Sequence, residues 1–269
     1  MGLARKPESG LAAEVLPPPL YAALRHTFAA GIDGVMLVGG TALAGYYAGH
    51  RRSDDLDLFT DSKPAQRAAV LAVGSLAELG ASLADVRSSA HFHHATCHLH
   101  GHDFTVQVVL DPNLFAIGSG VAADDRVQVA ALETLLKMKA ATLVSRASEK
   151  DLYDLAWFFQ QDRRLDVPTL LALGEQVDRG VNGEAVLISL IGTEPRESAC
   201  GFSLTKDPEE VHAEVARHYT VLGQVRAEAR LLYATTSGKV YHLVRSKALD
   251  DYRRVVGRLK KTLPWLARR

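Results

Sequence analysis

The segment that most constrains this chain covers residues 35–60, VMLVGGTALAGYYAGHRRSDDLDLFT. Its first four residues are apolar and β-branched-rich, which predicts a buried strand. Gly39-Gly40 then ends the strand with residues that accept φ > 0 and let a ligand approach the backbone. Thr41 stands where the N-cap of a helix is expected, and residues 42–48 can form two helical turns. The segment therefore predicts a strand, a tight turn and a short helix.

A second strand, DLDLF, follows the basic loop at residues 51–53 and carries two acids. Because side chains at i and i+2 of a strand share a face, Asp55 and Asp57 should project together while Leu56 and Leu58 point into a core. Two close carboxylates repel each other unless a cation neutralises them, and Mg²⁺ prefers one or two carboxylates plus substrate phosphates. A glycine turn that opens a helix suits an anion. This segment thus combines an anion site and a divalent-metal site, the two features that binding of a nucleoside triphosphate needs.

Composition limits the function classes only broadly. The 269 residues suffice for one large or two modest domains, and 31 basic residues balance 31 acidic ones, so no global charge indicates nucleic acid or membrane. Cys97 and Cys200 are too few and too distant to indicate a disulfide framework. The sequence shows no apolar signal core and no run of membrane-spanning length, so we expect a cytoplasmic protein.

The elements expected along the chain indicate an α+β protein. We expect a small mixed-sheet core with flanking helices in residues 1–160 and an all-helical domain in residues 161–269, divided at the polar break 162–166. The expected helices cover residues 20–30, 63–79, 130–159, 168–178, 208–232 and 244–263, and the expected strands, besides those above, cover 81–88, 91–99 and 103–110. Residues 111–129 are expected to be loop with one short strand, and residues 192–206 to be loop.

The predicted helix 130–159 carries charges on its apolar face. At 3.6 residues per turn, Lys139, Arg146, Lys150 and Asp154 fall in the same sector as several leucines, whereas Lys137 and Asp151 fall outside it and are expected to face solvent. Basic side chains are rarely buried unless they are paired or functional, so this stripe predicts one wall of a cleft beside the two aspartates. The alternative is a structural network in which Lys150 pairs with Asp154, and Arg146 with Glu149.

These two motifs together resemble the AbiEii/AbiGii nucleotidyltransferase family, which belongs to the DNA polymerase β-like superfamily and includes toxins of abortive-infection toxin–antitoxin systems. The motifs are Gly-Gly-Thr, then Arg-x-Ser-x-Asp-Leu-Asp, and later Lys139, Arg146 and Lys150-Asp151-x-x-Asp154. The likeness covers about residues 30–160. It implies a Mg²⁺-dependent enzyme that transfers a nucleotide from an NTP to an acceptor hydroxyl.

The resemblance also implies roles for individual residues. Gly39, Gly40 and Thr41 would hold the triphosphate, and Asp55 and Asp57 would bind the metal. Arg51 and Ser53 match the family's Arg-x-[Ser/Thr] motif that precedes the carboxylates. Lys139 and Arg146 would form the basic pair, with Asp154 (or Asp151) supporting them. Lys150 and Asp154 are also expected to bind substrate. RNA such as tRNA is the expected acceptor and a cognate antitoxin the expected partner; a small-molecule or protein acceptor, or a weakened nucleotide-binding pseudoenzyme, is the alternative.

The sequence departs from the superfamily pattern at one position. A third carboxylate from a neighbouring strand normally helps to bind metal and to deprotonate the attacking hydroxyl, and here Gln107 of the strand FTVQVVL occupies the expected place. An amide can neither act as a base nor bring charge to a metal. Asp103 and Asp111, at the two ends of that strand, are the other candidates.

Three further features have less specific interpretations. The hairpin HFHHATCHLHGHD offers histidines that could hold a transition metal, although contact with the acceptor is the favoured role. The aromatic residues Tyr153, Trp157, Phe158 and Phe159 indicate core rather than a base-stacking platform. The basic tail RRVVGRLKKTLPWLARR is more typical of a solvated helix face than of an RNA contact.

Overall fold

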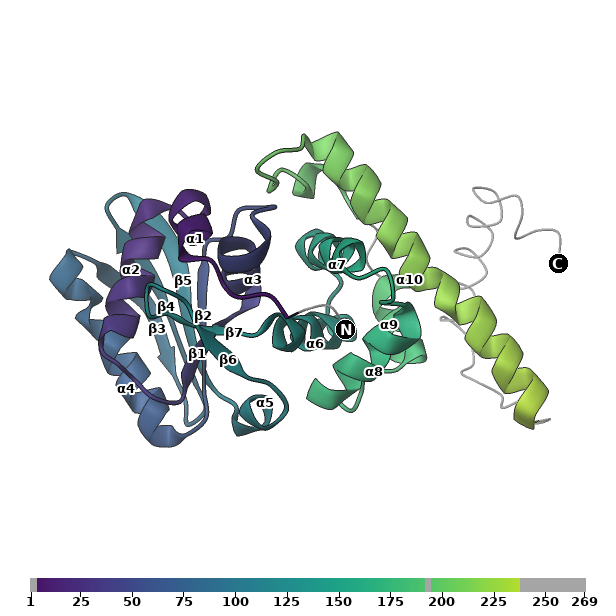
Figure 1. Ribbon diagram of the computed structural model, residues 1–269, viewed down its shortest axis with the longest axis horizontal. Coiled ribbons are helices and arrows are strands. Elements are labelled where there is room, and N and C mark those ends of the chain that lie inside the picture. The colour runs from purple at the N-terminus through teal and green to yellow at the C-terminus, as the bar shows by residue number, and fades with distance from the viewer. Residues whose placement is uncertain (1–3, 192–194, 238–269) are drawn as a thin grey trace.

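The computed structural model describes residues 4–191 and 195–237 (Figure 1). The helices are α1 Ser9–Val15, α2 Pro18–Ala29, α3 Gly39–Leu43, α4 Lys63–Gly74, α5 Pro112–Ile117, α6 Leu132–Thr142, α7 Glu149–Gln161, α8 Val167–Val177, α9 Gly183–Ile191 and α10 Pro208–Ser237. The strands are β1 Val35–Val38, β2 Asp55–Thr60, β3 Ser82–Ser88, β4 Phe92–Leu99, β5 His102–Leu110, β6 Gly120–Ala122 and β7 Gln128–Ala130.

The strands form one mixed sheet in the order β3-β4-β5-β2-β1-β7-β6. β2 runs parallel to β5 and β1 parallel to β7, while the other neighbouring strands are antiparallel. The mixed sheet with flanking helices confirms the expected architecture of the core. The short β1–β2 unit lies near the middle of the sheet, so the two aspartates sit at its centre rather than at an edge.

The two faces of the sheet differ in what covers them. α2 and α4 pack on one face of the sheet, over the fully buried Leu56, Leu58, Val106 and Val108 (Figure 1). α4 begins where the Ser62–Pro64 signal predicts, since the Ser62 hydroxyl accepts a hydrogen bond from the Ala65 amide. On the other face β2 exposes its alternate residues, which is the pattern of a strand with one solvated side.

Most elements predicted before residue 130 are confirmed, with small shifts of their ends. The β4–β5 hairpin, β3 and the helix after Ser62 lie where expected, although the last turn before Gly80, Ser75–Leu79, is 3-10 helix. Residues 111–129, expected to be mostly loop, also contain α5, β6 and β7. The prediction that Thr41 caps a helix is wrong, because α3 already begins at Gly39 and continues into a π-helical turn, Ala44–Ala48.

The single helix predicted over 130–159 is wrong: it is two helices. α6 ends at Thr142, the chain turns, and α7 starts at Glu149 with Ser148 as N-cap, whose hydroxyl accepts from the Asp151 amide at 3.3 Å. Lys139 therefore lies on α6 and Arg146 in the turn after it, so the two do not share a helical face. The chain reversal instead brings the acids of α7 back onto α6.

The described residues after α7 are mainly helical, with α8, α9, α10 and a short 3-10 turn, Glu197–Ala199. α9 falls in a segment for which no element was predicted. α8 packs on α6, and α10 on α7, within the same hydrophobic core cluster as the sheet (Figure 1). The division at 162–166 into two domains stays a prediction, and the predicted helix 244–263 and the basic tail lie outside the described residues.

Candidate active site

The two aspartates of β2 lie on the open face of the sheet, as their spacing predicts. Asp55 is exposed and Asp57 half-buried, whereas Leu56 and Leu58 between and after them are fully buried. On the parallel neighbour β5, Thr105 pairs with Asp55 and Gln107 with Asp57. The Thr105 hydroxyl donates a hydrogen bond to Asp55 Oδ1, which fixes the orientation of that carboxylate.

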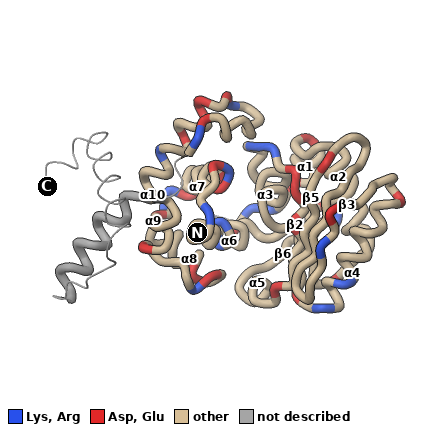
Figure 2. Tube along the Cα trace, turned by 180° about the vertical axis from the view of Figure 1, so that it is seen from behind, with Lys and Arg blue, Asp and Glu red and all other residues tan. Residues whose placement is uncertain are grey.

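The surroundings of the Asp57 carboxyl group disfavour its charged form. Burial and the neighbouring charge of Asp55 raise its pKa to about 6, and Lys139 and Arg146 offset only part of that shift. A carboxyl group in this situation is stabilised as the anion by a bound cation. The influence of Lys139 and Arg146 also shows that both positive charges lie near the aspartates. α6, which carries Lys139, packs against α3, the helix that begins at Gly39 (Figure 2).

The Gly39-Gly40 turn packs directly against this site. Gly39 has φ +71°, and a Cβ there would collide with the Asp57 carboxylate. A Cβ on Gly40 would come within 2.6 Å of Arg51 Nη2 and 2.9 Å of Ser53 Oγ. Both positions therefore require glycine, and the half-buried backbone of the turn lies beside the carboxylate.

Buried hydroxyl groups connect the turn to the carboxylate strand. The Thr41 side chain is fully buried, lies 3.0 Å from Ser53 Oγ and donates to the backbone carbonyl of Asp55. Ser53 is itself only 3% exposed. These contacts position the turn relative to Asp55, and neither hydroxyl faces solvent.

Asp154 of α7 is the centre of a buried ionic cluster. Arg51 donates to it bidentately, with Nε 2.6 Å from Oδ1 and Nη2 2.8 Å from Oδ2, and His50 Nε2 lies 2.9 Å from Oδ1. Lys139 Nζ lies 2.7 Å from Oδ2. Burial alone would raise the pKa of Asp154, but Lys139 and Arg51 hold it well below its ordinary value. The cluster ties the loop before β2 to α6 and α7.

Asp151 forms the second half of this cluster. Its Oδ1 accepts from Lys139 Nζ at 2.8 Å and its Oδ2 from the Ser148 hydroxyl at 2.6 Å, while Arg146 Nε lies 3.3 Å from Oδ2. Burial alone would lower the pKa of Lys139, but Asp154 and Asp151 together raise it, so the lysine stays charged. Arg146 differs from Lys139 in being largely exposed, with 69% of its side chain accessible.

Several predictions about these charges are corrected by the structure. Asp151, expected in solvent, is 2% exposed, because α7 folds back on α6. Lys137, also expected in solvent, is 8% exposed and donates to the Ile117 carbonyl. The alternative pairings are wrong as well: Arg146 contacts Asp151 rather than Glu149, and Asp154 is bound by His50, Arg51 and Lys139 rather than by Lys150. Lys150 is exposed on the first turn of α7.

No acid stands next to Asp57 on β5. The register places Gln107 there, as expected from the sequence. Asp103 lies four residues earlier in an exposed pair with His98, and Asp111 caps α5 by accepting from the Leu114 amide at 3.1 Å. Neither of them occupies the position of a third carboxylate beside the pair.

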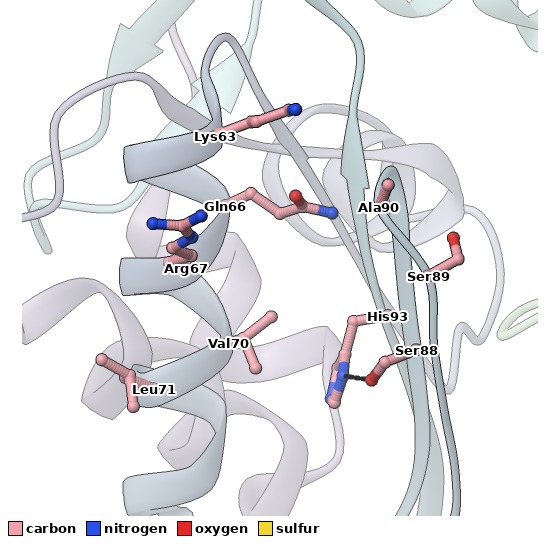
Figure 3. A pocket seen from close by; sticks show the side chains of 9 residues that line it. All are labelled: Lys63, Gln66, Arg67, Val70, Leu71, Ser88, Ser89, Ala90 and His93. Atoms are coloured by element: carbon pink, nitrogen blue, oxygen red, sulfur yellow. Dashed lines mark hydrogen bonds between the residues drawn. The ribbon is translucent and has the colours of Figure 1, made fainter.

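The histidine-rich hairpin contributes to both faces of the sheet. His94 and His98 share the open face with the aspartates, whereas His93 points to the opposite face, where its Nδ1 lies 2.8 Å from the Ser88 hydroxyl. There it lines a cavity of about 530 Å³ between α4 and the ends of β3 and β4 (Figure 3). Within residues 4–191 and 195–237, no three His, Cys, Asp or Glu side chains are arranged to hold a metal ion.

The donor set on β2 fits a hard divalent cation of the Mg²⁺ type. Asp55 and Asp57 offer carboxylate oxygens on one face, and the pKa of Asp57 stays raised although Lys139 and Arg146 partly offset the shift. Mg²⁺ is commonly held by one or two carboxylates, with the remaining positions filled by water and substrate phosphates. The half-buried glycine turn lies directly beside these carboxylates.

Comparison with known protein families shows which family this chain belongs to. A sequence model described as "Nucleotidyl transferase AbiEii toxin, Type IV TA system" matches residues 22–220. The chain belongs to the AbiEii nucleotidyltransferase family. It is therefore a nucleotidyltransferase of a toxin family, and the family suggested by the two sequence motifs is confirmed. The match includes the glycine turn, both aspartates, and the α6–α7 cluster.

Solved structures give more distant likenesses to this AbiEii-family chain. The MenT4 nucleotidyltransferase toxin from Mycobacterium tuberculosis H37Rv is 18% identical, with 85% of this chain and 94% of that one covered and a TM-score of 0.49. JHP933 from Helicobacter pylori is 16% identical, with 86% and 100% covered and a TM-score of 0.43. No curated protein sequence matches. In the described part of the chain, every helix is too short or too polar to span a membrane.

The sequence prediction did not include two residues of the site, His50 and Thr105. They carry no motif, and only the folded structure reveals their contacts. Asp151 was named only as an alternative to Asp154, and its burial was not predicted. Ser148 followed three residues later by an acid is typical of a helix start, and this signal would have divided the long helix.

Proposed function

We propose that this nucleotidyltransferase transfers a nucleotide from an NTP, with Mg²⁺, to an acceptor hydroxyl on RNA such as tRNA. The observation that carries the proposal is the convergence of two like-charged carboxylates, a glycine turn and two basic side chains around Asp57. No single feature is specific, but together they supply a cation site, a phosphate site and balancing positive charge. Those three are the requirements for attack on a triphosphate.

Asp55 and Asp57 would hold the metal ion, with the Thr105 hydroxyl keeping Asp55 in place. When bound, Mg²⁺ would neutralise charge on the phosphates and on the departing pyrophosphate. Two of its ligands would come from the protein, so NTP phosphates would supply much of the rest of its coordination. Metal and NTP should accordingly bind together more tightly than either does alone.

Gly39 and Gly40 would allow the triphosphate to approach the backbone beside Asp57. Arg146 would bind phosphate oxygens directly, because its exposed guanidinium is held near the site by Asp151. Lys139 would act from a more buried position, where its charge offsets the negative charge around Asp57. Both residues thus keep the roles predicted from the sequence, at different depths.

For Thr41, Arg51, Ser53 and Asp154 we propose positioning roles instead of direct substrate contact. All four side chains are buried, and their polar contacts run to one another, to His50 and Lys139, or to the protein backbone. They would hold the glycine turn and Lys139 in place before substrate arrives, which is how preorganised sites avoid reorganisation during reaction. Lys150, exposed nearby, would contact the incoming acceptor.

The toxin family supports a cognate antitoxin as partner, because its description names a toxin–antitoxin system. We place the reaction in the cytoplasm, where NTP and RNA are both present. The proposed division of labour gives residues 1–160 the chemistry and residues 161–269 a supporting role in acceptor binding.

The test is to incubate the purified protein with each α-labelled NTP, Mg²⁺ and total RNA, and to separate the products. Label on RNA supports the proposal. Label on the protein or on a small molecule would keep the chemistry and replace the acceptor. Binding of NTP without transfer to any acceptor would contradict the proposal.

A further inference from the structure

One row of side chains crosses the open face of the sheet beside the catalytic pair. On β5, Gln107 pairs with Asp57 of β2, and on β4, His94 pairs with Gln107. All three are partly accessible, whereas the residues alternating with them, such as Val106 and Ala95, are fully buried on the other face. At a strand spacing of about 4.8 Å, the Cα atoms of Asp57 and His94 lie roughly 10 Å apart.

Among the hairpin histidines, His94 is the one that stands in this row. His91, just before β4, and His100, between β4 and β5, are exposed and lie outside it. His98 is paired with Asp103, His102 lies 3.3 Å from Asp54, and His93 bonds Ser88 on the opposite face. In the part of the chain that the structure describes, neither ring nitrogen of His94 has a hydrogen-bond partner. Its ring is nevertheless oriented, because it stacks on Phe92 with 6.2 Å between centroids and 12° between planes.

Nucleotidyl transfer requires a proton acceptor, and this row lacks the acid that would serve. The attacking hydroxyl must lose its proton as its oxygen bonds to the α-phosphorus. The glycine turn follows β1, and Gln107 lies on β5, on the other side of β2. A triphosphate bound over Asp57 and the turn would therefore leave the β5 side, over Gln107, for the acceptor. The amide of Gln107 can orient a hydroxyl but cannot take its proton. The next side chain in the row is the imidazole of His94.

We propose that His94 is the general base of the transfer, an inference that rests on the proposed function. The acceptor O–H proton moves to a ring nitrogen of His94 while the acceptor oxygen bonds to the α-phosphorus. The bond from the α-phosphorus to the bridging oxygen breaks, and pyrophosphate leaves with that electron pair. The imidazolium then returns its proton to water. Gln107 orients the hydroxyl between His94 and the reacting phosphate.

The charged groups around His94 come from three directions. Arg87 of β3 pairs directly with it in the sheet, and Asp57 lies beyond Gln107 on β2. His93 precedes it on its own strand and faces the other side. Lys139 and Arg146 lie near Asp57.

The test compares single-turnover transfer rates from labelled NTP to total RNA between pH 5.5 and 8.5. General-base catalysis contributes about 10²–10⁴-fold, so His94→Gln should lower the rate by at least about 100-fold with little change in NTP affinity. The rise in rate with pH that imidazole deprotonation gives the wild type should disappear. His98→Gln, on the same strand and face, is the matched control and should keep both rate and profile.

A second variant separates proton transfer from a structural effect. Adding Gln107→Glu to His94→Gln places a carboxylate beside the reacting hydroxyl and should restore the rate at least tenfold. The proposal is overturned by a His94→Gln rate within threefold of wild type, by a slow variant that keeps the wild-type pH profile, or by no recovery in the double variant. A wild type that transfers to no acceptor would reject the proposed function itself, and this inference with it, whereas an inactive His94→Gln beside an active wild type concerns His94 alone.

Discussion

Replacing Asp57 by Asn should stabilise the metal-free protein at neutral pH. The folded protein raises the pKa of Asp57 from 3.8 to about 6, because burial and Asp55 disfavour its charge. A carboxyl group with a raised folded-state pKa binds more protons folded than unfolded, so its ionisation costs stability as pH rises. The cost begins near the unfolded pKa and is complete above about pH 6. Two units of pKa correspond to about 3 kcal/mol at full ionisation.

The assay is thermal unfolding in EDTA at pH 5 and pH 8. At roughly 2–4 °C per kcal/mol for a protein of this size, Asp57→Asn should raise Tm by about 5–10 °C at pH 8, and by roughly half as much at pH 5. Asp33→Asn, at an exposed carboxylate, is the control and should shift Tm by less than about 2 °C. Equal or lower stability of Asp57→Asn at pH 8 would refute the electrostatic description of the site.

Three further predictions follow from the same contacts. Asp154→Asn leaves Arg51 and Lys139 without their buried partner and should lower the free energy of unfolding by about 3–5 kcal/mol. Arg146→Ala, at an exposed pair, should lower it by less than about 1 kcal/mol. Urea unfolding measures both, and equal losses would disprove the buried cluster. Gly39→Ala adds a Cβ at φ +71° against Asp57, so NTP binding by calorimetry should weaken at least tenfold; unchanged affinity would contradict the close packing of the turn. Mg²⁺ with NTP should raise the Tm of the wild type but not that of the double variant Asp55→Asn/Asp57→Asn. EDTA should abolish nucleotide transfer, and transfer that persists in EDTA would exclude a required metal.

The sequence predicted the centre of this site because its chemistry is local. Period-two spacing alone puts Asp55 and Asp57 on one face, and the alternating leucines bury the other. The glycines are equally local, since a turn that touches a carboxylate leaves no room for a Cβ. The position of Gln107 beside Asp57 was also accessible, because the strand FTVQVVL is strongly patterned.

The basic side of the site was predicted for the wrong reason. A continuous helical wheel put Lys139 and Arg146 on one face, but the chain turns between them and the contacts are made by tertiary packing of α7 on α6. Burial of Asp151 and Asp154 depends on partners more than ten residues away in sequence, including Arg51, so no local period reveals it. The Ser148 cap was the local signal for the chain reversal.

The most direct test of the central claim is transfer of labelled nucleotide to RNA by Asp55→Asn and Asp57→Asn, each checked for native circular dichroism. Both variants remove one carboxylate oxygen donor while keeping side-chain shape. If the pair on β2 holds the metal and the triphosphate, both folded variants should lose transfer by at least about 1,000-fold. Transfer within tenfold of wild type by folded Asp57→Asn would contradict that assignment.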